Sequence, residues 1–238
     1  MAPSMQNDTK NLESFLLQHD SSALVRVLME LATDYPVVRE RLDRLKIAHA
    51  PALVAQELMS KLGALRDSGK YYTWREATGF AQELEIWLGQ VEREVLSKSP
   101  PAAVELFESF IESDVSWFEM VDDSGGSVGA VMRAACEHWL RAAKRCEGPV
   151  EMWITRLEGL HFSDQYGARD ALMGSAHLLL DGAGLQKMIG RLMELSTGTQ
   201  GLRLAATGRQ YETYKLSTVS AAIKLLNEAI QSGSDAAP

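Results

Sequence analysis

The sequence predicts an all-α protein made of antiparallel helix pairs, either a HEAT/TPR-like α-solenoid or a compact helical array. Apolar residues recur with helical period along almost the whole chain, as at Leu24, Val27, Leu28 and Leu31. No segment alternates apolar and polar residues with period two between turn signals, which disfavours strand-rich folds. Short turns separate the helical segments, as is usual within helix pairs.

The expected helices follow one another closely, and several begin at proline or at capping residues. Proline suits the first turn of a helix, so we expect helices to open at Pro51, Pro100 and Pro149. The spacing of these prolines is close to the period of HEAT repeats, which leaves true repetition open. Thr73–Glu76 is a capping box with Thr73 at the N-cap. In order, the expected helices cover 12–19, 24–31, 37–47, 51–62, 73–96, 100–118, 127–139, 149–157, 167–180, 185–195 and 216–230.

We expect one helical-repeat domain over residues 9–231, because the chain is long enough to bury a single sizeable core. The ends, residues 1–8 and 232–238, are rich in small and polar residues. They are expected to be disordered tails.

The composition resembles that of an ordinary soluble domain, with 46% hydrophobic and 24% charged residues. The net charge of -8 excludes a protein that binds nucleic acid through bulk positive charge. The N-terminal residues lack the pattern of a secretory signal, and no apolar run approaches the roughly 18 residues that span a bilayer. Two cysteines in this length favour a reducing compartment. We therefore expect a cytoplasmic protein without membrane contact.

Charge is unevenly distributed along the chain. Residues 83–123 hold eleven acidic and two basic residues, whereas residues 183–224 hold six basic and two acidic residues. Solvated helix faces explain such a pattern most simply. The alternative is a nucleic-acid site in the basic C-terminal third, because bases and aromatics alternate there as in single-strand binders. Its candidate residues are Arg203, Arg209, Tyr211, Tyr214 and Lys215.

The first motif that stands out is the turn at Asp122–Gly129, in which acidic residues and glycines precede a helix. Asp122 and Asp123 offer oxygen ligands for a hard cation, and a helix N-terminus offers N–H groups to an anion. The spacing matches neither an EF-hand nor a P-loop. The simpler interpretation is structural: the glycines permit positive φ, and the Asp and Ser side chains cap the next helix.

The second motif, Asp164–Asp170, also connects two expected helices. Asp164 is a plausible N-cap. Asp164, Tyr166, Arg169 and Asp170 together have the polar groups that a ligand-binding loop needs. The structural alternative is that Arg169 joins this loop to the first motif, because guanidinium groups commonly bridge carboxylates. That interpretation predicts a salt bridge from Arg169 to Asp122 or Asp123.

Other reactive side chains give no recognisable site. The five histidines are dispersed, and the Cys136–His138–Cys146 spacing is not that of a zinc site. No nucleophile elbow, zincin or dinucleotide-binding motif occurs. We expect no metal and no cofactor. The five tryptophans are expected mostly in the core.

The two motifs, together with the Trp74–Glu76 entry to a long helix, resemble a bacterial domain-of-unknown-function family of helical proteins. Members of that family also occur behind SWIM-type zinc fingers. The resemblance covers about residues 24–195, and the family's C-terminal pattern is not matched after Arg203. It implies an all-helical repeat fold, assigns no catalytic residue, and hints at nucleic-acid contexts only by analogy.

The leading expectation is a non-catalytic protein–protein interaction or scaffold module of a bacterial cytoplasmic system, because helical repeats usually bind through extended surfaces. One alternative is a nucleic-acid accessory module. The other is a metal-dependent hydrolase at Asp122, Asp123, Asp164 and Asp170, where clustered carboxylates would hold the ion. The oligomeric state stays open.

Overall fold

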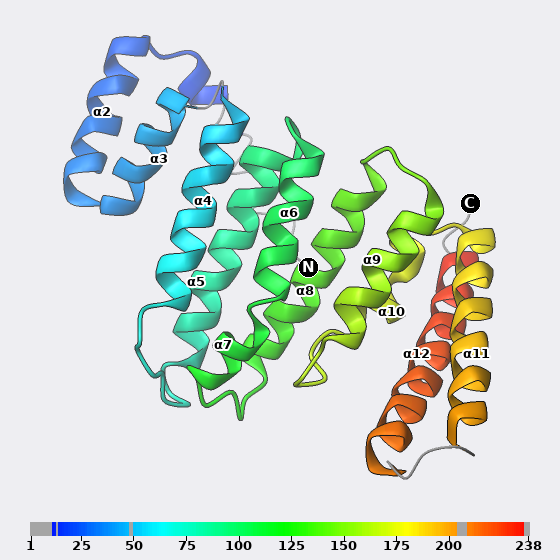
Figure 1. Cartoon of the computed structure of the whole chain (residues 1–238). Helices are drawn as coiled ribbons and strands as arrows, with labels where there is room; N and C mark the ends of the chain where they lie inside the picture. Colours follow the sequence, from blue (N-terminus) through cyan, green and yellow to red (C-terminus); the bar gives the residue numbers. More distant parts are fainter. Residues whose placement is uncertain (1–10, 13, 48–49, 204–208, 236–238) are drawn as a thin grey trace. The chain divides into compact units, whose positions relative to one another are not determined.

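The computed structural model describes residues 11–12, 14–47, 50–203 and 209–235, with side chains over 11–12, 14–43, 50–197 and 217–231. The regular secondary structure of the described residues is helical, and these residues contain no strand apart from one isolated β-bridge between Tyr72 and Val121 (Figure 1). The all-α prediction is therefore confirmed. The chain divides into two compact units, Met1–Ala50 and Pro51–Pro238. One folding domain over 9–231 stays a prediction.

The first unit contains a helical hairpin. Its helices α2 (Ser21–Asp34) and α3 (Pro36–Ile47) pack against each other. The Asp20 side chain caps α2 by accepting a hydrogen bond from the backbone N–H of Ser22 at 3.2 Å. Pro36 opens α3 directly after Tyr35, which explains why the link is so short.

The second unit contains the remaining elements, and Figure 1 shows its helices α4, α5, α6 and α8 lying alongside one another. Two of the expected proline-opened helices begin at the proline itself, and Pro149 occupies the N-cap position of the third. The helix α12 continues to Asp235, where a tail was expected from residue 232; residues 1–8 and 236–238 lie outside the described residues. The elements are α4 (Pro51–Arg66), α5 (Ala77–Gln90), the π-helix η1 (Val91–Leu96), α6 (Pro100–Ile111), α7 (Asp114–Glu119), α8 (Ser127–Lys144), α9 (Val150–Phe162), α10 (Ala171–Gly174), the 3₁₀-helix η2 (Ala176–Leu178), α11 (Gly182–Arg203) and α12 (Arg209–Asp235).

Buried tryptophans anchor the core of the second unit, and each indole N–H shown here has a hydrogen-bond partner. Trp87 donates to the carbonyl oxygen of Leu58 at 2.9 Å, and Trp117 donates to that of Phe110 at 3.0 Å. Trp139 donates to the Glu108 carboxylate at 3.0 Å. Trp153 is buried as well, whereas Trp74 is 63% exposed. The expectation of core tryptophans is thus confirmed for all but Trp74.

The predicted capping box at Thr73 forms a turn, and α5 begins only at Ala77. The Glu76 carboxylate accepts hydrogen bonds from the Thr73 backbone N–H at 3.0 Å and from its hydroxyl at 2.8 Å. Because the hydroxyl bonds to Glu76, it does not cap the helix, and only the Glu76 half of the box is realised.

Candidate functional site

A buried ion pair between Arg169 and Asp114 fixes the connection that follows α9. The guanidinium donates two parallel hydrogen bonds to the carboxylate, from Nε to Oδ2 at 3.0 Å and from Nη2 to Oδ1 at 2.8 Å. The two side chains are 3% and 0% exposed. The remaining nitrogen, Nη1, donates to the Leu160 carbonyl and to the Ser163 hydroxyl, both at 2.8 Å. Arg169 therefore ties α7 to the end of α9.

The predicted salt bridge from Arg169 to Asp122 or Asp123 is wrong, although its bridging role is right. The oxygens of Asp123 accept hydrogen bonds from the backbone N–H groups of Val128 and Gly129, each at 2.9 Å. Asp122 accepts from the backbone N–H and the hydroxyl of Ser124. Both carboxylates are engaged locally, and a different acid, Asp114, meets the arginine.

The loop between α9 and α10 is organised by Asp164. Its carboxylate accepts hydrogen bonds from the backbone N–H groups of Tyr166 and Gly167, both at 2.9 Å, and of Arg169, at 2.8 Å. Gly167 has φ +70°, which an L side chain rarely adopts. Asp164 thus shapes the loop and does not cap the next helix; Asp170 holds the N-cap position of α10 but makes no capping hydrogen bond.

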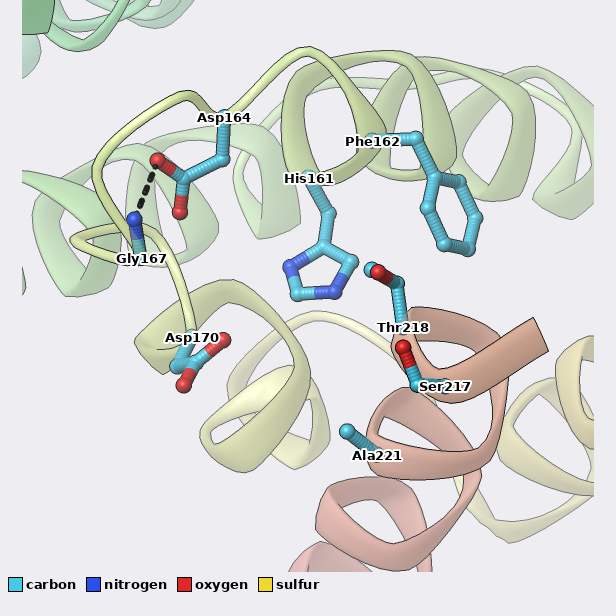
Figure 2. A pocket seen from close by; sticks show the side chains of 8 residues that line it. All are labelled: His161, Phe162, Asp164, Gly167, Asp170, Ser217, Thr218 and Ala221. Carbon is cyan, nitrogen blue, oxygen red and sulfur yellow. Dashed lines mark hydrogen bonds between the residues drawn. The ribbon is translucent and has the colours of Figure 1, made fainter. Parts of the chain in front are cut away.

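A pocket of about 320 Å³ lies between this loop and α12. Figure 2 shows the His161 ring extending from α9 toward the α12 residues Ser217 and Thr218, with Asp170 on the loop side. The complete lining is His161, Phe162, Asp164, Gly167, Asp170, Ser217, Thr218 and Ala221. The structure thus brings Asp164 and Asp170 of the second motif to one pocket, together with residues far away in the sequence.

His161 is the unusual member of this pocket. The residue is 3% exposed, yet neither ring nitrogen has a hydrogen-bond partner. Burial lowers its pKa below the ordinary value of 6.5, and this effect outweighs the opposing charge of Asp170. The ring is therefore neutral at pH 7, with one N–H donor and one nitrogen acceptor. The Arg169 backbone is close enough to raise its pKa slightly, but no partner meets hydrogen-bond geometry. Buried polar atoms normally find partners, so the ring of His161 is an exception among the buried side chains.

Tyr166 lies at the outer side of the loop. It is half exposed, and its ring stacks on Phe118 of α7 with centroids 5.1 Å apart. Because Tyr166 is absent from the pocket lining, the structure gives it a packing role.

The first motif forms a cap. Gly126 takes φ +71° at the N-cap position, and Asp123 satisfies the first free N–H groups of α8. Asp122 lines a separate open pocket of about 680 Å³ with Trp74 and Arg75. The four aspartates of the hydrolase alternative are therefore not one cluster. Across the described part of the chain, no three His, Cys, Asp or Glu side chains are placed to hold a metal ion.

The five residues of the nucleic-acid alternative lie at the end of α11 and in the first part of α12. Arg203 ends α11 and Arg209 opens α12, with Tyr211, Tyr214 and Lys215 following in α12. The side chains of these five residues lie outside the described residues. The nucleic-acid alternative stays a prediction.

Cys136 and His138 lie on α8 and are not among the residues that line the pocket. Cys136 is buried in α8, and burial raises the pKa of its thiol to about 12, so the thiol is inert at pH 7. His138 stacks on Phe107 with centroids 5.3 Å apart, and burial lowers its pKa.

Two important residues, Asp114 and His161, escaped the sequence reasoning. Asp114 belongs to no motif and was counted only as one charge in an acidic stretch. His161 follows Leu157 and Leu160 at helical spacing, so its place on the buried face of α9 was readable from the pattern. The absence of a partner for its ring is a tertiary property that the pattern does not carry.

A second candidate surface lies on the N-terminal hairpin. We call it the α2 surface: the exposed side chains Val25, Val27, Leu28, Met29 and Leu31. Val27 and Met29 are two positions apart, so their side chains diverge by about 160° around the helix. A helix apolar over so wide an arc is normally covered on more than one side. Ala32 is the one buried residue of α2.

Comparison with known proteins gives one family. A model described as a family of unknown function, DUF6880, matches residues 7–230. The resemblance to a domain-of-unknown-function family is thereby confirmed, and nothing in the match bears on SWIM zinc fingers or on helical repeats. No curated protein and no solved structure matches. Within the described residues, no helix is both long and apolar enough to cross a membrane.

Proposed function

The chain belongs to the DUF6880 family of unknown function, and we propose that it is a non-catalytic protein–protein interaction module that docks another protein on its α2 surface. The observation that carries the proposal is the exposure of the apolar side chains of α2, such as Met29, which is 51% exposed. Exposed contiguous apolar groups of this kind mark interaction sites on soluble proteins.

The architecture of the hairpin supports the proposal. A helix pair must bury its apolar faces against a further element to be stable. Within the described residues of the first unit, α3 packs against α2, and the side chains of the α2 surface stay exposed. The uncovered side has the aliphatic side chains that a partner helix packs into.

The charge of the hairpin indicates which partner fits. Residues 21–47 hold five basic and four acidic residues, so the hairpin is close to neutral. Arg39 and Asp43 also neutralise each other in an ion pair at 3.3 Å. Such a surface has no field that would select a strongly charged partner such as nucleic acid. The chemistry it matches is an apolar face of another protein, most simply an amphipathic helix.

A site-specific photocrosslinking experiment tests the proposal in the full chain. A photoreactive phenylalanine analogue replaces Met29 in cells of the source organism, and mass spectrometry identifies what it captures. The matched control places the analogue at Ile86, which is equally exposed but lies on α5 in the second unit. The captured protein is then purified, and its affinity is measured for the unaltered chain, for Val25→Glu with Met29→Glu, and for Ile86→Glu.

The proposal requires a different protein to be captured at Met29 and not at Ile86. The Val25→Glu, Met29→Glu chain must bind that protein at least about tenfold more weakly, while Ile86→Glu binds unchanged. Crosslinks from Met29 only to the chain's own second unit, only to another copy of the chain, or to nothing would each overturn it.

A further inference from the structure

The pocket beside His161 has the features of a ligand site that is independent of the α2 surface. Its volume of about 320 Å³ is at the lower end of the range for small-molecule pockets. One wall comes from the end of α9 and the α9–α10 connection, and the other from Ser217, Thr218 and Ala221 of α12, as Figure 2 shows. A ligand here would touch segments about fifty residues apart.

The ring of His161 has no hydrogen-bond partner among the described protein groups. The residue is 3% exposed and lines the pocket, and both of its ring nitrogens are buried without a hydrogen bond. A buried donor and a buried acceptor that make no hydrogen bonds lower the stability of the fold. A ligand that forms hydrogen bonds with them removes that cost. The ring makes no hydrogen bond to the hydroxyls or carboxylates around it, so it lacks the arrangement of a catalytic triad.

The charges that face the pocket decide the sign of the ligand. Asp164 and Asp170 are both acidic, and Arg169, which precedes Asp170 in the same loop, has its guanidinium committed to Asp114, Leu160 and Ser163. As far as the structure describes the chain, the Asp170 carboxylate makes neither an ion pair nor a hydrogen bond. The described side chains that line the pocket therefore give it a negative charge, which disfavours phosphates and carboxylates.

The available oxygens argue against a metal ion as the occupant. Both Asp164 oxygens already accept backbone N–H groups, so that carboxylate has little capacity left for a cation at close range. That leaves His161 and Asp170, which are fewer protein ligands than metal sites use. A cation with its own N–H donors fits the acceptor atoms of Asp170 and His161 better than a metal ion does.

We propose that this pocket binds a cationic nitrogen group, an ammonium or a guanidinium, with Asp170 as its counter-ion and His161 as its second hydrogen-bond partner. Ser217 and Thr218 of α12 line the same space on the opposite side. Phe162 and Ala221 line the pocket with carbon and accommodate the alkyl stem of the ligand. The group has two possible sources, a free amine or a basic side chain of a peptide.

The test follows the ring signals of His161 by ¹H–¹³C NMR in the full chain, assigned with His161→Gln. The probes are n-butylammonium and butylguanidinium as cations, n-butanol as the neutral control and butyrate as the anionic control. N-acetyl-lysine N-methylamide represents a basic peptide side chain. The variants are Asp170→Asn and, as a matched control, Glu85→Gln, which alters an exposed carboxylate on α5.

We expect saturable shifts of the His161 signals with at least one cation and none with butanol or butyrate. Asp170→Asn should lower the affinity for the cation by about tenfold or more, because it removes the charge-assisted hydrogen bond. Glu85→Gln should leave that affinity unchanged. Tighter binding of the lysine derivative than of n-butylammonium assigns the site to a peptide side chain, and the reverse assigns it to a free amine. No saturable cation binding, or equal binding to the Asp170→Asn chain, would overturn the proposal.

Discussion

Asp114 at the start of α7 and Arg169 before α10 form a bidentate ion pair whose two side chains are almost completely buried. The pair joins positions 55 residues apart, and Asp114 also accepts a hydrogen bond from the backbone N–H of Val115 at 2.7 Å. Removing one partner leaves the other as an uncompensated buried charge, which is far more costly than losing a surface pair.

We expect Asp114→Ala and Arg169→Ala each to lower the free energy of unfolding by about 3–5 kcal/mol. Urea denaturation followed by tryptophan fluorescence measures the loss. The double variant should cost clearly less than the sum of the two, because neither charge is then left alone. Strictly additive losses would show that the two side chains do not stabilise each other.

The cap of α8 gives a second prediction. Asp123→Ala should destabilise the protein by about 1 kcal/mol, because two N–H groups of α8 lose their acceptor. Gly126→Ala should cost about 1–2 kcal/mol, because φ +71° is unfavourable for alanine although the space for a Cβ is open. Gly125→Ala is the matched control, since it also has open space but no positive φ. Thermal melting of the three variants measures the loss of stability in each. A loss in Gly125→Ala as large as that in Gly126→Ala would contradict the prediction.

The lowered pKa of His161 predicts that the protein loses stability in mild acid. Below about pH 6.5, the unfolded chain takes up a proton on this ring that the folded chain resists, so stability falls as pH falls. The stability that the neutral His161 ring contributes is complete above about pH 6.5. It declines by at most about 1.4 kcal/mol per pH unit until the lowered folded pKa is reached. His138 adds to the same trend.

Urea midpoints between pH 5 and 8 measure this slope. His161→Leu should flatten it, whereas His19→Leu, which alters an exposed histidine, serves as the control. An unchanged slope in the His161→Leu protein would mean that its ring titrates freely in the folded chain.

The α2 surface predicts variants that alter binding without altering stability. Val25→Glu and Met29→Glu place charges where the side chains already face water. Each should change the free energy of unfolding by no more than about 0.5 kcal/mol. Circular dichroism melts check this before any binding experiment. A loss of several kcal/mol would show that these side chains are buried within the protein itself.

The sequence predicted what local physics determines. Helical periodicity, proline at helix starts and the Asp123 cap depend on residues a few positions apart, and the structure has them. The pairing of Arg169 depends on which acid the fold brings near it, and Asp114 lies in a different helix with no motif around it. The sequence did not predict the unpartnered ring of His161 for the same reason. Whether that ring has a hydrogen-bond partner depends on how α9, the α9–α10 loop and α12 pack together.

The two-walled construction of the His161 pocket couples ligand affinity to the docking of α12. That helix is held by a row of small and aliphatic side chains against α10, η2 and α11, namely Val219, Ala222, Leu226 and Ala229. If α12 detaches, Ser217, Thr218 and Ala221 leave with it and half of the pocket is lost. Any occupant that contacts both walls therefore shifts the local unfolding equilibrium of α12 by its own binding free energy. Amide hydrogens of α12 would then exchange more slowly in the bound protein, and helix protection becomes a direct readout of occupancy.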